Sequence, residues 1–298
     1  MKFRYKNAVC PIISFYSYKG GVGRTTALAA FAAFYASTYE KKVVMIDCDF
    51  EAPGFANHLE LDKAPPTNGV LEFLLDRQFA GDEVKLPPYV IQVDKKYSGN
   101  GEIYAILAGN LSSEIAIPDA PKYGSHFKHY LEGISRLNIS GQDQMFEHMS
   151  DLLDEVNQEF APDLILIDTR NGINDIFGNI GLPFSSVMVG IFNNDFQSLP
   201  GMRFFLNIGM QSEFATILVN SHTSEAKLPD SFKQKVQLLF QKVTFPEDKT
   251  QALKMSYIMK DARLDNVGTT GDNALVNLIK GSPIYQHFFE TVVAQLDR

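Results

Sequence analysis

A glycine-rich segment between an apolar run and a helix-forming run constrains this chain more than any other feature. Residues 12–17 are apolar enough for a buried strand, Gly20, Gly21 and Gly23 follow, and a segment rich in alanine begins after Thr25. Closely spaced glycines let the backbone turn sharply and point successive N–H groups into one concavity, and the following helix adds the positive end of its dipole. The segment therefore predicts a site for an anion such as phosphate.

This loop departs from both common nucleotide-binding patterns. Against G-x-x-x-x-G-K-[ST], Tyr18 stands at the first glycine and Arg24 at the lysine. Against G-x-G-x-x-G, Thr26 stands where the third glycine is needed. The segment fits K-G-G-x-G-[KR]-T-T and resembles the deviant Walker-A ATPases of the MinD and ParA group, most closely the subset written K-G-G-V-G-R. The alternative is an ordinary glycine-rich turn between a strand and a helix.

The resemblance implies an ATP and Mg²⁺ site in the loop. Lys19 would be the signature lysine that reaches the nucleotide of a partner subunit, and Arg24 would be the cationic contact within the subunit. Thr25 would ligate Mg²⁺, and Thr26 would support an α-phosphate oxygen. The implied nucleotide-binding residues of the loop are Lys19, Gly20, Gly21, Val22, Gly23, Arg24, Thr25 and Thr26.

Acidic residues follow two apolar segments that read as strands. Asp47 ends residues 42–47, and Asp49 follows two residues later. Asp168 ends residues 163–168. Open α/β sheets place their ligands at the carboxyl ends of the strands. On the resemblance, Asp49 orients the attacking water, Asp47 supports Mg²⁺ through its water shell, and Asp168 is the Walker-B acid that binds a water on Mg²⁺. For the first pair, a solvated acidic turn is the alternative.

Two further residues have open roles. The segment from Asp168 to Gly172 fits D-[ST]-R-x-G and resembles the switch of the same subset, in which Arg170 either senses phosphate or pairs with a surface acid. Asn220 ends a strand at 215–220 and stands where the group reads the adenine edge. An asparagine after a strand can also be a turn residue.

Apolar strands alternate with helical patterns along the chain, which predicts an α/β fold: a doubly wound, mostly parallel sheet with helices on both faces. We expect one P-loop ATPase domain over residues 1–298, with a variable helical insertion around 109–140. The expected helices are 26–38, 68–79, 126–137, 142–160, 199–211 and 283–298, and the further expected strands are 89–93, 102–107 and 187–192. The last helix carries an apolar stripe without a basic rim, so we expect it to pack on the domain rather than on a membrane.

The composition argues against several classes of partner and site. A net charge of −8 and a pI near 5.3 argue against nucleic acid as the main partner. No apolar run has the length of a membrane span, which predicts a cytoplasmic protein. Cys10 and Cys48 form no C-x-x-C motif and are read as reduced. His126, His129 and His148 show no clear metal-ligand spacing and are read as surface or packing residues.

Together with the resemblance, these features predict a Mg²⁺-dependent ATPase with slow hydrolysis. ATP would close two subunits into a homodimer that presents a surface to a protein partner. The catalytic candidates are Lys19, Arg24 and Asp49. Three alternatives remain: a non-hydrolysing nucleotide-binding module, a ParA-like DNA-associated ATPase, and a relative that uses ATP for synthesis or for protein phosphorylation, although the C-terminus lacks a tyrosine cluster.

Overall fold

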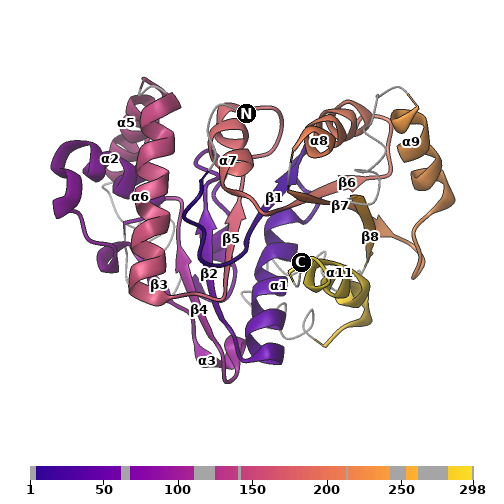
Figure 1. The fold of residues 1–298 in the computed structure, drawn as a ribbon, viewed down its shortest axis with the longest axis horizontal. Helices are drawn as coiled ribbons and strands as arrows, with labels where there is room; N and C mark the ends of the chain where they lie inside the picture. Colours follow the sequence, from indigo (N-terminus) through magenta and orange to yellow (C-terminus); the bar gives the residue numbers. More distant parts are fainter. Residues whose placement is uncertain are drawn as a thin grey trace.

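A twisted central sheet with helices on both faces forms the core of the protein (Figure 1). The computed structural model describes residues 5–61, 68–110, 125–139, 142–212, 214–241, 253–260 and 281–296. Within these residues the sheet has eight strands in the order β3-β4-β2-β5-β1-β6-β7-β8. Only β3 runs antiparallel to its neighbour. This confirms the predicted α/β, doubly wound, mostly parallel sheet.

The strands and the main helices alternate along the chain. The strands are β1 (Ile12–Ser17), β2 (Lys42–Asp47), β3 (Ile91–Gln92), β4 (Glu102–Ile106), β5 (Leu164–Asp168), β6 (Val187–Asn193), β7 (Ala215–Thr223) and β8 (Leu253–Met259). The helices are α1 (Arg24–Tyr39), α2 (Val70–Ala80), α3 (Lys95–Ser98), α5 (Ser125–Ile139), α6 (Gln142–Phe160), α7 (Leu182–Phe184), α8 (Leu199–Gln211), α9 (Asp230–Phe240) and α11 (Pro283–Val293). A short π-helical turn, η5 (Phe177–Gly181), precedes α7.

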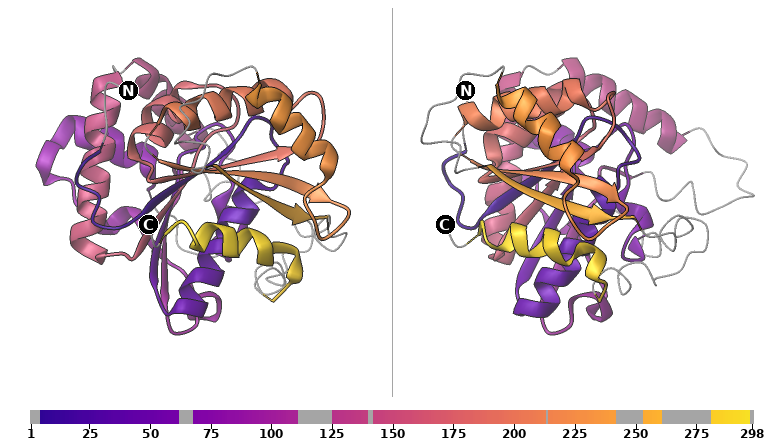
Figure 2. Two further views of the ribbon diagram at one scale, coloured as in Figure 1. Left: turned by 45° about the vertical axis from the view of Figure 1, so that its right-hand side comes forward. Right: turned by 90° about the vertical axis from the view of Figure 1, so that its right-hand side faces the viewer.

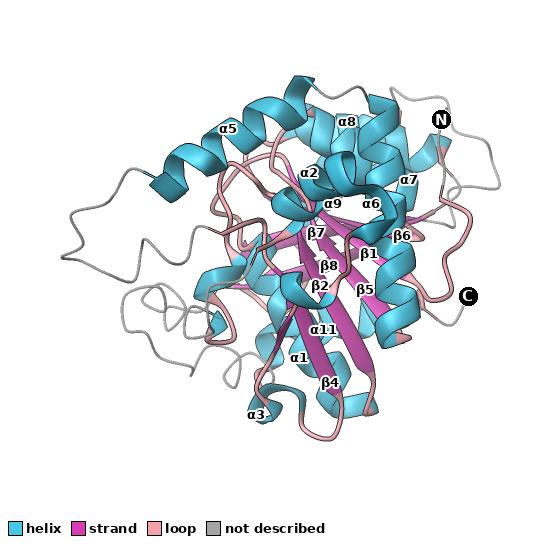
Figure 3. Ribbon diagram, turned by 90° about the vertical axis from the view of Figure 1, so that its left-hand side faces the viewer, coloured by secondary structure: helices cyan, strands magenta, loops and turns pink. Residues whose placement is uncertain are grey.

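Side chains alternate between the two faces of the sheet, so each face has its own apolar core. On one face, Ile13 and Phe15 of β1 pack in a cluster with α1 and α11. On the other face, Ile12 packs with α2 and α6, and Tyr16 packs with α8 and α9. Figure 2 shows α1 and α11 on one side of the strands and α8 and α9 on the other. Figure 3 shows α2, α5 and α6 gathered on the side opposite α1.

The last helix packs on the domain, as predicted. Its apolar positions Tyr285, Phe288, Phe289 and Val292 are buried. Phe289 stacks on Phe34 of α1 with the ring centroids 4.6 Å apart. Helix α1 is buried nearly all round because it lies between the sheet and α11, which explains why its sequence lacks a polar face.

The predicted segments agree closely with these elements, and the differences are local. Strand β2 and helix α8 have the predicted bounds. The expected strand at 89–93 is reduced to β3, because Pro87 and Pro88 begin a short 3-10 turn that ends at Tyr89. Part of the expected insertion, residues 111–124 and 140, lies outside the described residues, and the single-domain assignment stays a prediction. None of the described helices has both the length and the apolar character needed to cross a bilayer.

Candidate functional site

The glycine loop joins β1 to α1 at the carboxyl edge of the sheet. Gly21 and Gly23 have φ angles of 75° and 81°, in the left-handed region that favours glycine. A Cβ at Gly20 would lie 3.0 Å from the side-chain nitrogen of Asn171, which shows how closely the loop approaches the segment after β5. Tyr18, at the position where the standard loop carries glycine, packs its ring against Gly201 of α8. The loop therefore combines two left-handed glycines with the N-terminus of α1, an arrangement that is typical of anion sites.

Strand register brings the predicted acids together. Asp47, the last residue of β2, pairs with Asp168, the last residue of β5, and Asp168 also pairs with Phe15 of β1. The two carboxylates are almost completely buried at 1% and 0% exposure, and Asp49 is 4% exposed. Asp47 and Asp168 thus lie side by side at the ends of neighbouring strands, and Asp49 lies in the turn that follows β2. The topology explains this arrangement, because β5 lies between β1 and β2 in the sheet.

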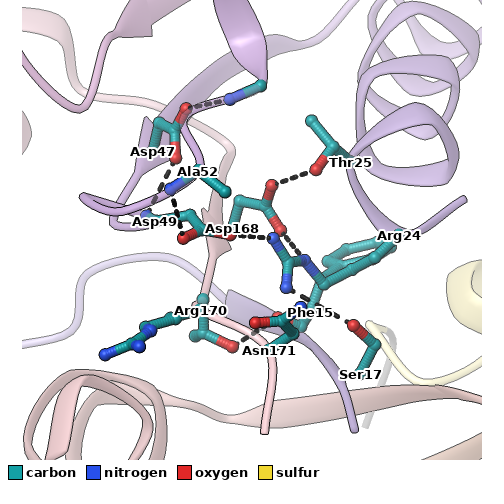
Figure 4. A network of polar contacts seen from close by, with 12 residues as sticks. Phe15, Ser17, Arg24, Thr25, Asp47, Asp49, Ala52, Asp168, Arg170 and Asn171 are labelled. Carbon is teal, nitrogen blue, oxygen red and sulfur yellow. Dashed lines mark hydrogen bonds and ion pairs between the residues drawn. The ribbon is translucent and has the colours of Figure 1, made fainter. Parts of the chain in front are cut away.

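The Arg24 side chain lies between two of these acids (Figure 4). Its Nη2 donates to Oδ2 of Asp49 at 2.9 Å, and its Nε donates to Oδ1 of Asp168. Its Nη1 also reaches the hydroxyl of Ser17 at 3.4 Å. Burial would lower the pKa of Arg24, but Asp168 and Asp49 outweigh burial and raise it, so the guanidinium is charged. In this structure Arg24 is directed at the carboxylates, where the sequence predicted a contact with phosphate.

Thr25 connects the loop to the same acid. Its Oγ1 donates to Oδ2 of Asp168 at 2.6 Å. A Cβ at Gly54 would lie 3.0 Å from the Thr25 side chain, so the segment after β2 also closes against this threonine. The structure therefore brings together Thr25 and Asp168, two of the three predicted metal-site residues. In the described part of the chain, no three His, Cys, Asp or Glu side chains are arranged to hold a metal ion as they stand.

Asp47 organises the turn that follows β2. Its Oδ1 accepts from the backbone N–H of Asp49 at 2.9 Å, and its Oδ2 accepts from Gly54 and Phe55, both at 3.2 Å. Burial, and then the charge of Asp168, raise the pKa of Asp47 to about 7, although the bonds from the backbone oppose this change. Burial also raises the pKa of Asp168, with Arg24 and Thr25 acting in the opposite direction. Burial and the neighbouring acids thus disfavour the charged forms of Asp47 and Asp168, and a bound cation would favour these forms.

The raised pKa of Asp47 predicts a pH-dependent stability of the nucleotide-free protein. An unfolded aspartate titrates near 3.9, so between about pH 4 and pH 7 the folded state binds more protons than the unfolded state. The contribution of Asp47 to the stability of the folded state is complete below about pH 4 and is lost as the pH rises through 7. The free energy of unfolding should therefore fall over this window by an amount on the order of a few kcal/mol.

Urea unfolding of the wild type and of Asp47→Asn between pH 4 and pH 8 measures this effect. The asparagine variant loses hydrogen bonds and should be less stable than the wild type near pH 4, and the difference between the two curves should shrink as the pH rises. A constant difference across the range would contradict the assignment.

Lys19 lies against the loop between β6 and α8. Its Nζ is 3.6 Å from Oδ2 of Asp195, with the side chains 30% and 42% exposed, and it also donates to Oε1 of Gln197. Phe196, between these two partners, is 80% exposed. In this structure Lys19 is therefore held within its own subunit, at the outer edge of the glycine loop.

The remaining predicted residues have defined positions. Thr26 Oγ1 lies 3.2 Å from Nε2 of His58, and His58 Nδ1 lies 2.8 Å from the carbonyl of Gly54, which links the loop helix to the turn after β2. Arg170 forms an ion pair with Glu51, the second of its two expected roles. Strand β7 continues past Asn220 to Thr223, so Asn220 neither ends the strand, as predicted, nor lies in a turn. It is 1% exposed, and its Nδ2 has no hydrogen-bond partner among the described residues.

Sequence reasoning missed the residues that hold the loop from outside. Five residues contact the predicted ones but belong to no motif that would indicate a site: Ser17, Gly54, His58, Asp195 and Gln197. Gly54 had the clearest signal, because it ends the acidic segment that starts at Asp47. The others depend on how distant segments pack.

The comparisons with known proteins agree with this geometry. A model of the CobQ/CobB/MinD/ParA nucleotide binding domain matches residues 13–180, more than half of the chain, and these residues include the loop and all three acids. A comparison with curated protein sequences finds no match.

Several solved structures resemble the whole chain. MinD from Pyrococcus horikoshii, complexed with Mg-ADP, is 17% identical with a TM-score of 0.59, over 95% of this chain and 94% of that one. A putative plasmid partition protein from Borrelia burgdorferi, bound to AMPPNP, is 15% identical with a TM-score of 0.59, over 95% and 99%. The MinC:MinD complex from Aquifex aeolicus is 15% identical with a TM-score of 0.59, over 97% of each chain. At these identities the likeness supports the fold, while the domain match identifies the family. The chain belongs to the CobQ/CobB/MinD/ParA nucleotide-binding domain family.

Proposed function

We propose that this protein is a Mg²⁺-dependent ATPase that acts as a dimerisation switch for a protein partner. The observation that carries the proposal is the convergence of the glycine loop, the start of α1 and three buried acids at one edge of the sheet. Phosphates need donors and positive charge, whereas Mg²⁺ needs carboxylate and hydroxyl oxygens. Both sets of groups occur side by side here.

The loop residues suit a triphosphate. The left-handed glycines Gly21 and Gly23 turn backbone N–H groups into a common concavity, and the sixteen-residue helix α1 begins directly after them. Arg24 adds a planar fork of donors that matches two phosphate oxygens. The amide of Asn220 is buried, and its Nδ2 has no partner in the described part of the chain, so it has hydrogen-bonding capacity for a base edge. These residues would hold ATP.

The acids suit Mg²⁺ and the attacking water. Thr25 and Asp168 would hold the ion, and Asp47 would hold a water in its shell. When bound, Mg²⁺ neutralises charge that develops on the phosphoryl oxygens. Asp49 is fixed by its bond from the N–H of Ala52 at 3.2 Å, which leaves its other oxygen directed at Arg24. Once Arg24 leaves, this oxygen can align a water and accept its proton.

Calorimetric titration with ATP and Mg²⁺ tests the nucleotide site. Gly23→Val should abolish measurable binding, because valine disfavours the φ angle of 81° at this position. Arg24→Ala should weaken ATP binding by at least about tenfold through the loss of a charged, two-pronged contact. Gly178→Ala is the matched control, because Gly178 has open space around it and no left-handed φ angle. Unchanged ATP affinity in both loop variants would reject the site.

The dimer and the partner belong to the same proposal. Two nucleotide-bearing faces repel unless positive charge from one subunit meets the phosphates of the other, and the flexible stem of Lys19 suits that reach. The Aquifex aeolicus relative forms a MinC:MinD complex, which supports a protein partner for this chain.

A second candidate function is a nucleotide-binding module that does not hydrolyse ATP. One observation favours it: Arg24 engages the two acids that catalysis would need. Steady phosphate release from ATP separates the two candidates. The net charge of −8 gives less support to a ParA-like association with DNA.

A further inference from the structure

Every carboxylate oxygen of the acid cluster already has a hydrogen-bond partner. Asp168 uses one oxygen for Arg24 and the other for Thr25. Asp49 uses one for Arg24 and the other for the N–H of Ala52. Both oxygens of Asp47 accept backbone N–H groups. A carboxylate oxygen can accept a hydrogen bond and bind a cation at the same time, so these bonds alone do not exclude a metal ion. A metal ion is opposed by the positive charge that already lies between Asp49 and Asp168.

This positive charge is the guanidinium of Arg24. It holds Asp49 and Asp168 with different nitrogens of one guanidinium, and its side chain is 8% exposed, against 5% and 0% for the two acids. The guanidinium thus supplies the positive charge that the cluster requires. A lysine could not do this in the same way, because its ammonium is a single point charge without the planar fork.

We propose that Arg24 makes metal binding dependent on nucleotide, by occupying the acids until a triphosphate draws it away. This inference rests on the proposed function, since it concerns how the same site is loaded. A metal ion alone would displace Arg24 from Asp49 and Asp168 and leave a buried guanidinium without a counterion, which is strongly unfavourable. A triphosphate offers negatively charged oxygens to the guanidinium, and Arg24 then releases Asp168 to the metal and Asp49 to the attacking water.

The consequence is that the metal ion binds together with the nucleotide and not before it. The nucleotide-free protein should bind divalent cations poorly, whereas nucleotide and metal should bind together with strong positive coupling. Loss of Arg24 should therefore have opposite effects on the two ligands. Affinity for the metal alone should rise, because the acids become free, and affinity for the nucleotide should fall.

Mn²⁺ binding followed by electron paramagnetic resonance tests this order without requiring turnover. In the wild type, a saturating non-hydrolysable ATP analogue should raise the Mn²⁺ affinity at least tenfold above the affinity of Mn²⁺ alone, after correction for Mn²⁺ bound by free analogue. Without nucleotide, Arg24→Ala should bind Mn²⁺ at least tenfold more tightly than the wild type. Arg24→Gln, which keeps much of the side-chain volume without the charge, should behave in the same direction.

Arg77→Ala is the matched control. Arg77 is another buried arginine, 9% exposed, whose Nε donates to Asp151 at 3.0 Å away from the site. Its loss should leave the Mn²⁺ affinity unchanged, which separates a local effect from general loosening. Circular dichroism identifies any variant that fails to fold. If one of the two Arg24 variants fails, the other carries the test, because a bound triphosphate supplies metal ligands of its own and a rise in the wild type alone does not identify Arg24 as the cause.

Two outcomes would overturn the inference. One is a wild type that binds Mn²⁺ equally well with and without bound nucleotide. The other is a folded Arg24→Gln variant whose affinity for Mn²⁺ alone matches that of the wild type. A wild type that binds no nucleotide would instead refute the proposed function, and the two failures are therefore distinguishable.

Discussion

Asp49→Asn is expected to retain ATP but to hydrolyse it at least about 10²-fold more slowly than the wild type, since a general base typically contributes 10²–10⁴. Asparagine can keep the bond from the N–H of Ala52, so the turn should persist. Its amide, however, cannot take a proton from the attacking water. Phosphate release under saturating ATP, together with an ATP titration of the same variant, separates turnover from binding.

Glu51→Gln provides the matched control for this result. Glu51 lies two residues further along the same turn, its side chain is 51% exposed, and it pairs with Arg170. We expect its loss to change the hydrolysis rate only slightly. Hydrolysis at the wild-type rate in Asp49→Asn, with loss of hydrolysis in Glu51→Gln, would assign the water-positioning role to Glu51.

Lys19→Ala is expected to abolish ATP-dependent dimerisation while ATP still binds to the monomer. In the present structure Lys19 pairs with Asp195 and Gln197 on the surface. Exposed ion pairs typically contribute only ~0–1 kcal/mol, so Lys19 can leave these partners at little cost when a second subunit offers a triphosphate. Light scattering in the Asp49→Asn background with ATP should show a dimer, and adding Lys19→Ala should raise the dimer dissociation constant at least about 100-fold.

Two variants sharpen the interpretation of this experiment. Lys41→Ala removes another partly exposed lysine, paired with Asp163 at 2.8 Å, and should leave the dimer intact. Asp195→Asn removes the ion pair between Lys19 and Asp195 within the subunit and should not weaken the dimer. A dimer that survives Lys19→Ala would reject the role of Lys19 across the interface, and a protein that stays monomeric with every nucleotide would reject the switch.

The elements of the fold and the position of the site follow from local sequence. Apolar strands such as β2 and β5 end in acids, and parallel strands place their carboxyl ends at one edge, so Asp47 and Asp168 were expected to be near each other. The glycine loop could be predicted because the positive φ angles at Gly21 and Gly23 favour glycine. These features depend on residue types at short spacing, which the sequence displays directly.

The contacts that set the state of the site could not be predicted in this way. Arg24 can point toward phosphate or toward Asp168, and the motif is the same in both cases. The choice depends on which charges are near it in three dimensions. Lys19 and Gln197 are 178 residues apart, and their contact follows from how the β6–α8 loop packs beside the glycine loop. The bond between Thr26 and His58 likewise depends on the path of the turn after β2.

A crystal structure with a non-hydrolysable ATP analogue and Mg²⁺ would test the central claim most directly. We expect a triphosphate against the backbone N–H groups from Gly20 to Thr26, with the Arg24 guanidinium on phosphate oxygens and no longer within hydrogen-bond distance of Asp168. A nucleotide bound elsewhere, or a vacant loop at saturating analogue with Arg24 still paired to Asp49 and Asp168, would contradict it.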